Sequence, residues 1–92
     1  MKVTVETTEG TQVREYSAED EKVLANDIYE IAEWIFNAVD EKCRRHGDRV
    51  VEANTAFNPK KLSKVEKDTI IKDLTFETAK DRTDRLEQEI ME

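Results

Sequence analysis

The sequence is short of the residues that usually mark a chemical site or a loop-rich fold. Its 92 residues include two glycines, one proline, one cysteine, one histidine and one tryptophan. One cysteine cannot form an intrachain disulfide, which fits a reducing compartment. A glycine-rich phosphate loop, a nucleophile elbow and a metalloprotease motif are all missing. We therefore expect no enzyme, no catalytic residues and no cofactor.

Long hydrophobic runs are also missing. No apolar stretch follows Met1-Lys2, and none approaches the roughly 18 residues of a membrane span. These features predict a cytoplasmic protein with neither a signal peptide nor a membrane partner. Charged residues make up 40% of the chain, which with so little glycine and proline is typical of a solvated helical domain. The length predicts a single domain over residues 1–92, with no small-molecule substrate evident.

The net charge of −7 is unevenly distributed along the chain. Residues 1–41 carry three basic and eleven acidic side chains, whereas residues 42–49 and 60–67 are basic. An acidic chain repels a phosphate backbone except at such patches, so general nucleic-acid binding is disfavoured. The alternative function is a small regulator that binds nucleic acid or an acidic protein through patches 42–49 and 60–67. Its candidate contact residues are Arg44, Arg45, Lys60 and Lys61.

Residues 1–16 alternate apolar and polar side chains around Gly10, which predicts a β-hairpin. A two-residue loop, Glu9-Gly10, places the valines on opposite faces. A three-residue loop over 8–10 pairs Val5 with Val13, and we favour it. A lone hairpin is marginal in water, so it must lie on the helices or pair with another chain.

Capping patterns place the helices of residues 17–92. Ser17 begins a short helix, and Asp27-Ile-Tyr-Glu30 is the start of a long one that should continue to Phe57 and end at Asn58-Pro59. Gly47 inside it marks a break or a close crossing, at a cost of about 1 kcal/mol relative to alanine.

Two further predicted helix starts follow Pro59. Ser63-Lys-Val-Glu66 is a full capping box, and Thr75 is the expected cap of a last helix. That helix carries a separate stripe with 3-4-3-4 spacing: Phe76, Ala79, Thr83, Leu86 and Ile90. The fold class is therefore α+β, mostly α: an N-terminal β-hairpin, a short helix, one long helix and one or two C-terminal helices.

The long helix carries a packing stripe with a period near 3.6 residues, which includes both Cys43 and His46. Three residues apart, these two offer only two zinc ligands, and no further Cys or His exists. No carboxylate stands three or four residues from His46 to orient its imidazole. We therefore expect both residues to pack in the core, with no metal site.

Aromatic residues beside this stripe are candidates for partner contact. Trp34 lies about 60° outside the stripe, so either the hairpin or the short helix covers it, or it stands at a partner surface. Tyr29 and Phe36 widen the stripe on its other shoulder to about 160°, more than one short neighbour covers. Other segments or chains should therefore pack against more than one side of that helix. We expect a partner surface that includes Trp34, Tyr29 and Phe36.

One segment resembles a known group. Residues 27–43, DIYEIAEWIFNAVDEKC, with Arg45 just after, are similar to a pattern in small uncharacterised prophage-encoded proteins. That pattern is D-I-x-x-(I)-x-x-W-I-x-x-A-x-x-x-K, then a Cys and a basic residue, after a short Leu-containing helix. The matching residues are Asp27, Trp34, Ile35, Ala38, Lys42 and Cys43. The resemblance implies a phage structural or assembly protein and carries no catalytic residue.

These observations together predict a non-catalytic protein of phage or prophage type that works by protein–protein interaction or assembly. The broad apolar arc, the displaced Trp34 and the open hairpin edges favour self-association as a homo-oligomer or membership of a phage-derived assembly.

Overall fold

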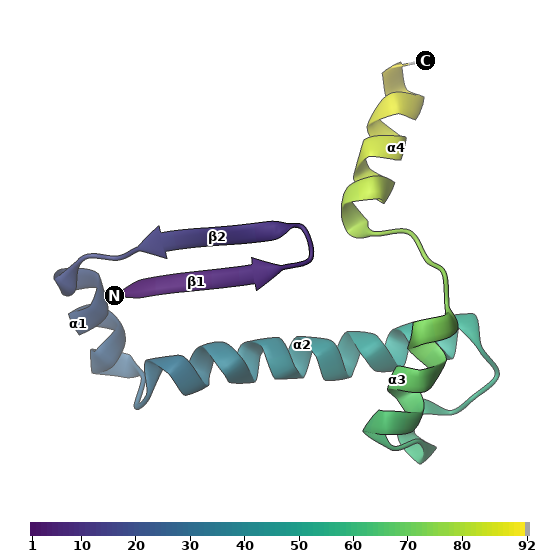
Figure 1. Cartoon of the computed structure of the whole chain (residues 1–92), viewed down its shortest axis with the longest axis horizontal. Coiled ribbons are helices and arrows are strands. Elements are labelled where there is room, and N and C mark those ends of the chain that lie inside the picture. The colour runs from purple at the N-terminus through teal and green to yellow at the C-terminus, as the bar shows by residue number, and fades with distance from the viewer. Residues whose placement is uncertain (92) are drawn as a thin grey trace. The chain divides into compact units, whose positions relative to one another are not determined.

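The computed structural model describes residues 1–91 of the chain (Figure 1). It confirms the α+β fold class, because an N-terminal antiparallel hairpin is followed by four α-helices. The elements are β1 (Lys2–Thr7), β2 (Gly10–Glu15), α1 (Ala18–Asp27), α2 (Ile31–Asn54), the 3-10 helix η1 (Pro59–Lys61), α3 (Lys64–Asp73) and α4 (Ala79–Met91). Two helices thus follow the long one.

The chain divides into two compact units, Met1–Lys42 and Cys43–Glu92, with the division inside α2. The first unit holds the hairpin, α1 and the beginning of α2, and the second holds the rest. The single domain expected from the length stays a prediction.

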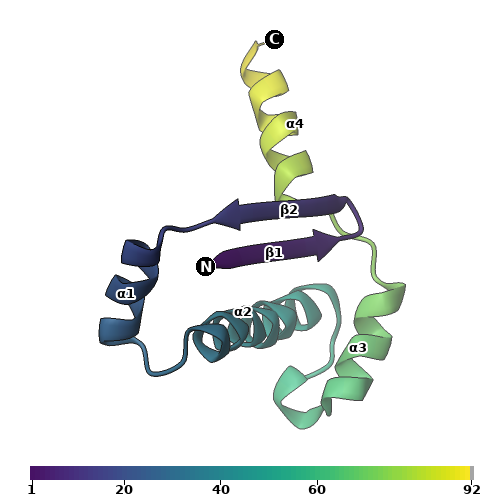
Figure 2. The same ribbon diagram turned by 60° about the vertical axis from the view of Figure 1, so that its left-hand side comes forward.

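The hairpin has a different register from either one considered from the sequence. β1 and β2 lie side by side in Figures 1 and 2, and Val5 pairs with Gln12 while Thr4 pairs with Val13. The turn is Thr8-Glu9. Thr7 Oγ1 accepts a hydrogen bond from Glu9 N at 3.2 Å, and Gly10 takes a φ of +132°, which other residues rarely adopt. The three-residue loop is therefore wrong, and Val5 and Val13 point to opposite faces.

α1 begins as predicted, because Ser17 Oγ accepts a hydrogen bond from Asp20 N at 3.0 Å. The expected start of the long helix at Asp27 is wrong. Asp27 is the last residue of α1, where Ile28 N donates to Leu24 O at 2.8 Å. α2 begins only at Ile31, after a short connection. Asp27 therefore does not cap α2, because it still belongs to the last turn of α1.

Within the second unit, α3 lies against the C-terminal part of α2. Gly47 does not break α2, and a Cβ at this position would lie 4.0 Å from Ile71 Cδ1. Gly47 therefore faces α3 at an ordinary packing distance that leaves room for a Cβ. Lys67 Nζ of α3 donates to Asp48 Oδ1 of α2 at 2.9 Å, and Val51, one turn further along α2 from Gly47, is fully buried.

α2 ends at Asn54, earlier than the predicted Phe57. Thr55 is the reason, because its hydroxyl donates to Val51 O at 2.7 Å and accepts from Phe57 N at 3.2 Å, which turns the backbone out of the helix. Asn58 then caps η1, with Oδ1 accepting from Lys60 N at 3.1 Å.

The capping box of α3 is confirmed. Ser63 Oγ accepts from Glu66 N at 3.2 Å, and Ser63 N donates to Glu66 Oε1 at 3.1 Å. The cap of the last helix is not Thr75 but Thr78, whose Oγ1 accepts from Asp81 N at 3.0 Å. The break near Leu74 is correct, but it extends over residues 74–78.

Candidate interaction surface

The described residues bury very little apolar surface. Val51 is the only large hydrophobic side chain among residues 1–91 that is completely buried. The chain exposes 8424 Å² for a mass of 10.7 kDa. A folded monomer of that mass exposes about 5,500 Å². Much of the surface that a globular chain hides therefore stays open here.

The first unit presents three aromatic side chains to solvent. Tyr29, in the connection between α1 and α2, is fully exposed, and Trp34 and Phe36 on α2 are 56% and 58% exposed. Positions two apart on a helix point about 160° away from each other, so the last two rings flank α2 on different sides. Between them, Ile31 and Ile35 are half-buried. Neither the hairpin nor α1 covers Trp34 fully, so its ring is available to a partner.

The hairpin is exposed on both faces. Val5 and Val13 are each about half exposed, on opposite sides because of the observed register. Among the described residues no third strand pairs with β1 or β2, so both edges keep unpaired backbone groups. A two-stranded sheet of this kind needs contacts with other elements or with another chain to be stable.

The basic candidates lie in the second unit and are exposed. Lys60 and Lys61 form most of η1, while Arg44 and Arg45 lie on α2 and already interact with other groups of the chain. The patch at 60–67 is partly neutralised from within. Its Lys67 pairs with Asp48, and another lysine, Lys64, forms an ion pair with Asp68 one turn along α3.

The expectation that Cys43 and His46 pack in a core is wrong, because both side chains are exposed. The face of α2 that α3 covers is centred on Gly47 and Val51, and so it is rotated away from His46. Within residues 1–91, no group of three or more His, Cys, Asp or Glu side chains is arranged to hold a metal ion.

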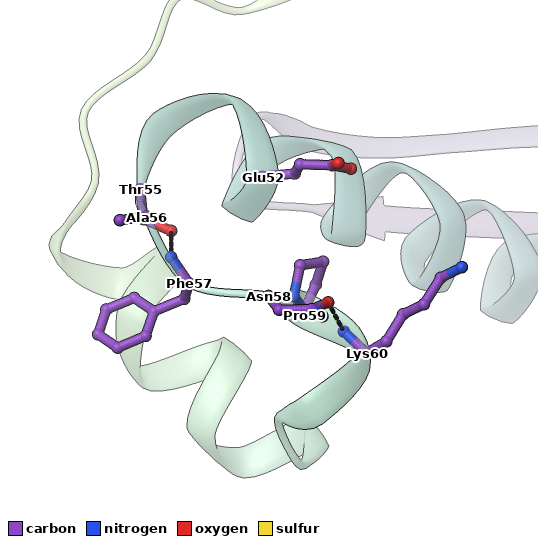
Figure 3. Close-up of a pocket in the computed structure, with 7 residues that line it drawn as sticks. All are labelled: Glu52, Thr55, Ala56, Phe57, Asn58, Pro59 and Lys60. Atoms are coloured by element: carbon purple, nitrogen blue, oxygen red, sulfur yellow. Dashed lines mark hydrogen bonds between the residues drawn. The ribbon is translucent and has the colours of Figure 1, made fainter.

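An open hollow of about 470 Å³ lies beside the loop after α2 (Figure 3). It is lined by Glu52, Thr55, Ala56, Phe57, Asn58, Pro59 and Lys60. Figure 3 shows the Thr55 hydroxyl and the Asn58 amide oxygen bonded to backbone amides of the same loop, with the Phe57 ring pointing away from the other labelled side chains.

The candidate residues predicted from the sequence left out α4. Its apolar edge is exposed, with Ile90 84% and Leu86 45% accessible. The 3-4-3-4 spacing in the sequence was the signal that could have identified it, because that spacing is typical of a helix that packs against another helix.

Two carboxyl groups have lowered pKa values, one in an ion pair and one in a helix cap. The Arg85 guanidinium donates to both oxygens of Glu77, at 2.9 and 3.2 Å, and this hydrogen bonding lowers the pKa of that carboxyl. The Ser63 backbone and then its hydroxyl lower the pKa of Glu66. Both carboxylates hold the ends of helices in place.

No family model, curated protein or solved structure matches this chain. Within residues 1–91, no helix combines the length and the apolar content that crossing a membrane requires.

Proposed function

We propose that this protein is a non-catalytic assembly protein that works by contact with other protein chains, first of all with copies of itself. The observation that supports the proposal is the 8424 Å² of accessible surface. This exceeds the surface of a folded monomer of equal mass by about 2,900 Å².

That excess is of the size that obligate association removes. Obligate interfaces bury roughly 2,000–5,000 Å² or more counted over both partners, and two copies of this chain together carry an excess of about 5,800 Å². The exposed side chains also fit, because tryptophan and tyrosine are enriched among residues that dominate binding energy. Trp34, Phe36 and Tyr29 are therefore proposed as contact residues of the first unit. The two rings on different sides of α2 would need either two neighbours or one that wraps around the helix.

The prophage part of the proposal is supported by the resemblance of residues 27–43. Trp34 and Ile35 lie in the matched pattern, and Trp34 is accessible in this structure. A short helix that contains Leu24 precedes the pattern as α1. We therefore propose a component of a phage-derived protein assembly.

Sedimentation velocity on the full chain, over a concentration series from micromolar to millimolar, tests self-association. The expected result is a sedimentation coefficient that rises with concentration. Trp34→Ala should weaken the association constant about tenfold or more, as loss of a dominant contact does. The matched control is Glu33→Gln, on the preceding residue of α2, which should leave the association constant within about twofold. A wild-type chain that remains monomeric across the series would contradict the proposal.

A further inference from the structure

The apolar edge of α4 lacks a covering element. Ala79, Thr83, Leu86 and Ile90 recur at intervals of four, three and four residues, which is the 3.5-residue period of helices that coil around each other. No residue of α4 is buried, and Ile90 is 84% exposed. The side chains along the edge differ in size: the two in the first half are small, and the two in the second half are large.

We propose that α4 pairs with α4 of a second copy of this chain in an antiparallel, two-fold symmetric helix pair. This inference rests on the proposed self-association and names one of its surfaces. In the antiparallel arrangement Ile90 of one copy faces Ala79 of the other, and Leu86 faces Thr83. Each large side chain then meets a small one, which fills the layers evenly. A parallel pair would place alanine against alanine at one end and leave a gap there.

The charges beside the edge favour the same arrangement. Lys80 and Glu87 flank the edge on one side, and Arg82 and Glu89 flank it on the other. In an antiparallel pair each side of the edge meets the same side of the second copy. Lys80 therefore meets Glu87 of the other chain, and Arg82 meets Glu89. Two-fold symmetry repeats both contacts, so four opposite-charge pairs form. A parallel pair brings together only Arg82 with Glu87.

The beginning of α4 is already held in place for this role. Arg85 bonds to Glu77, which precedes the helix, and donates to Glu89 Oε1 at 3.2 Å one turn later. These bonds order α4 before it meets a partner, which lowers the conformational entropy lost on association. A helix of 13 residues is marginal by itself, so its pairing adds to contacts elsewhere in the assembly.

Charge reversal on the full chain tests the pair. The acidic variant carries Lys80→Glu and Arg82→Glu, and the basic variant carries Glu87→Lys and Glu89→Lys. Each variant alone should self-associate at least about tenfold more weakly, because four attractive pairs become repulsive. An equimolar mixture of the two should recover association as a heterodimer. The control variant, Asp81→Lys with Asp84→Lys, changes the charge as much as the basic variant does but on the outer side of α4, and it should associate like wild type.

The outcomes separate this inference from the proposed function. If wild type self-associates but the charge variants associate equally well, or if the mixture recovers nothing, the α4 pair is overturned while self-association stands. A monomeric wild-type chain overturns both. Circular dichroism of each variant checks that the fold is kept, which we expect because the substituted side chains are exposed.

Disulfide trapping tests the orientation, in a Cys43→Ser background that removes the exposed native thiol. In an antiparallel pair, position 79 of one copy lies about 16 Å along the axis from position 79 of the other. A disulfide requires Cα atoms within about 7 Å. Ala79→Cys alone should therefore not cross-link, whereas its mixture with Ile90→Cys should. Cross-linking of Ala79→Cys to itself, with none between the two variants in the mixture, would overturn the antiparallel pair.

Discussion

Lys67 Nζ of α3 lies 2.9 Å from Asp48 Oδ1 of α2, and the two side chains are 17% and 24% exposed. This ion pair joins two residues that are 19 positions apart in sequence and lie on different helices, and Val51, three residues after Asp48, is fully buried. It is shielded from solvent more than Lys64–Asp68, whose side chains are 75% and 54% exposed. The packing of α3 on α2 therefore combines one buried apolar residue with one shielded charge pair.

The first prediction concerns that pair. Asp48→Asn should destabilise the protein by about 1–3 kcal/mol, because it leaves the Lys67 ammonium half-buried without its counter-charge. Urea unfolding at one fixed protein concentration measures the change. Asp68→Asn, in the exposed pair on α3, is the matched control and should cost about 0.5 kcal/mol or less. Equal losses in the two variants would show that Asp48 and Lys67 do not hold α3 on α2.

The second prediction concerns the core residue Val51. Val51→Ala removes two buried methyl groups and should lower the free energy of unfolding by about 1–3 kcal/mol. Val65→Ala, on the exposed side of α3, makes the same chemical change and should stay within about 0.5 kcal/mol of wild type. Thermal or urea unfolding compares them. A larger loss of unfolding free energy in Val65→Ala than in Val51→Ala would contradict the burial of Val51.

The third prediction concerns Gly47. An alanine Cβ there would lie 4.0 Å from Ile71 Cδ1, an ordinary van der Waals distance, and the backbone is helical. Gly47→Ala should therefore stabilise the protein by about 0.5–1 kcal/mol, through the loss of glycine's freedom in the unfolded chain. Gly47→Leu should destabilise it, because its longer side chain would push Ile71 away. Destabilisation by alanine itself would indicate a closer crossing than the structure shows.

The fourth prediction concerns the cap of α3. Hydrogen bonds from Ser63 lower the pKa of Glu66 below its ordinary value of 4.5. A lowered pKa in the folded state stabilises the fold at pH values above that ordinary value, and the contribution is lost as the pH falls through the folded-state pKa. Ser63→Ala should return the Glu66 pKa toward 4.5 and weaken this acid dependence. A carboxyl-detected NMR titration measures the pKa, and an unchanged value would contradict the capping box.

The local signals in the sequence were reliable where one side chain decides the structure. Ser17 and Ser63 begin their helices as predicted, because a hydroxyl at the first position satisfies a backbone amide wherever the helix goes. The last helix shows the limit of this reasoning. Thr75 and Thr78 both offer a suitable hydroxyl, and only the course of the connection at 74–78 selects Thr78.

The hairpin register was not predictable from the valine pattern. A buried face fixes the register of a strand, because a slip by one residue moves every side chain to the other face. Here Val5 and Val13 are both about half exposed, so no buried face imposes that choice. Thr7 and Gly10 decide the turn locally instead.

The exposure of the candidate residues was predicted in part. Trp34 and Phe36 are accessible, and the broad arc of the long helix suggested this. Cys43 and His46 were expected in a core because the stripe was assumed to be the covered side. Periodicity identifies an apolar face but not the neighbour that covers it, and α3 approaches α2 over Gly47 instead.

The most direct test of the central claim is the dependence of the thermal unfolding midpoint on protein concentration. If association with other copies covers the apolar surface that this chain leaves exposed, the midpoint must rise as the concentration rises, because the folded state is stabilised by mass action. We expect such a rise for wild type and a smaller one for Trp34→Ala. A midpoint that stays constant over a hundredfold range, in a chain that sediments as a monomer, would contradict the account.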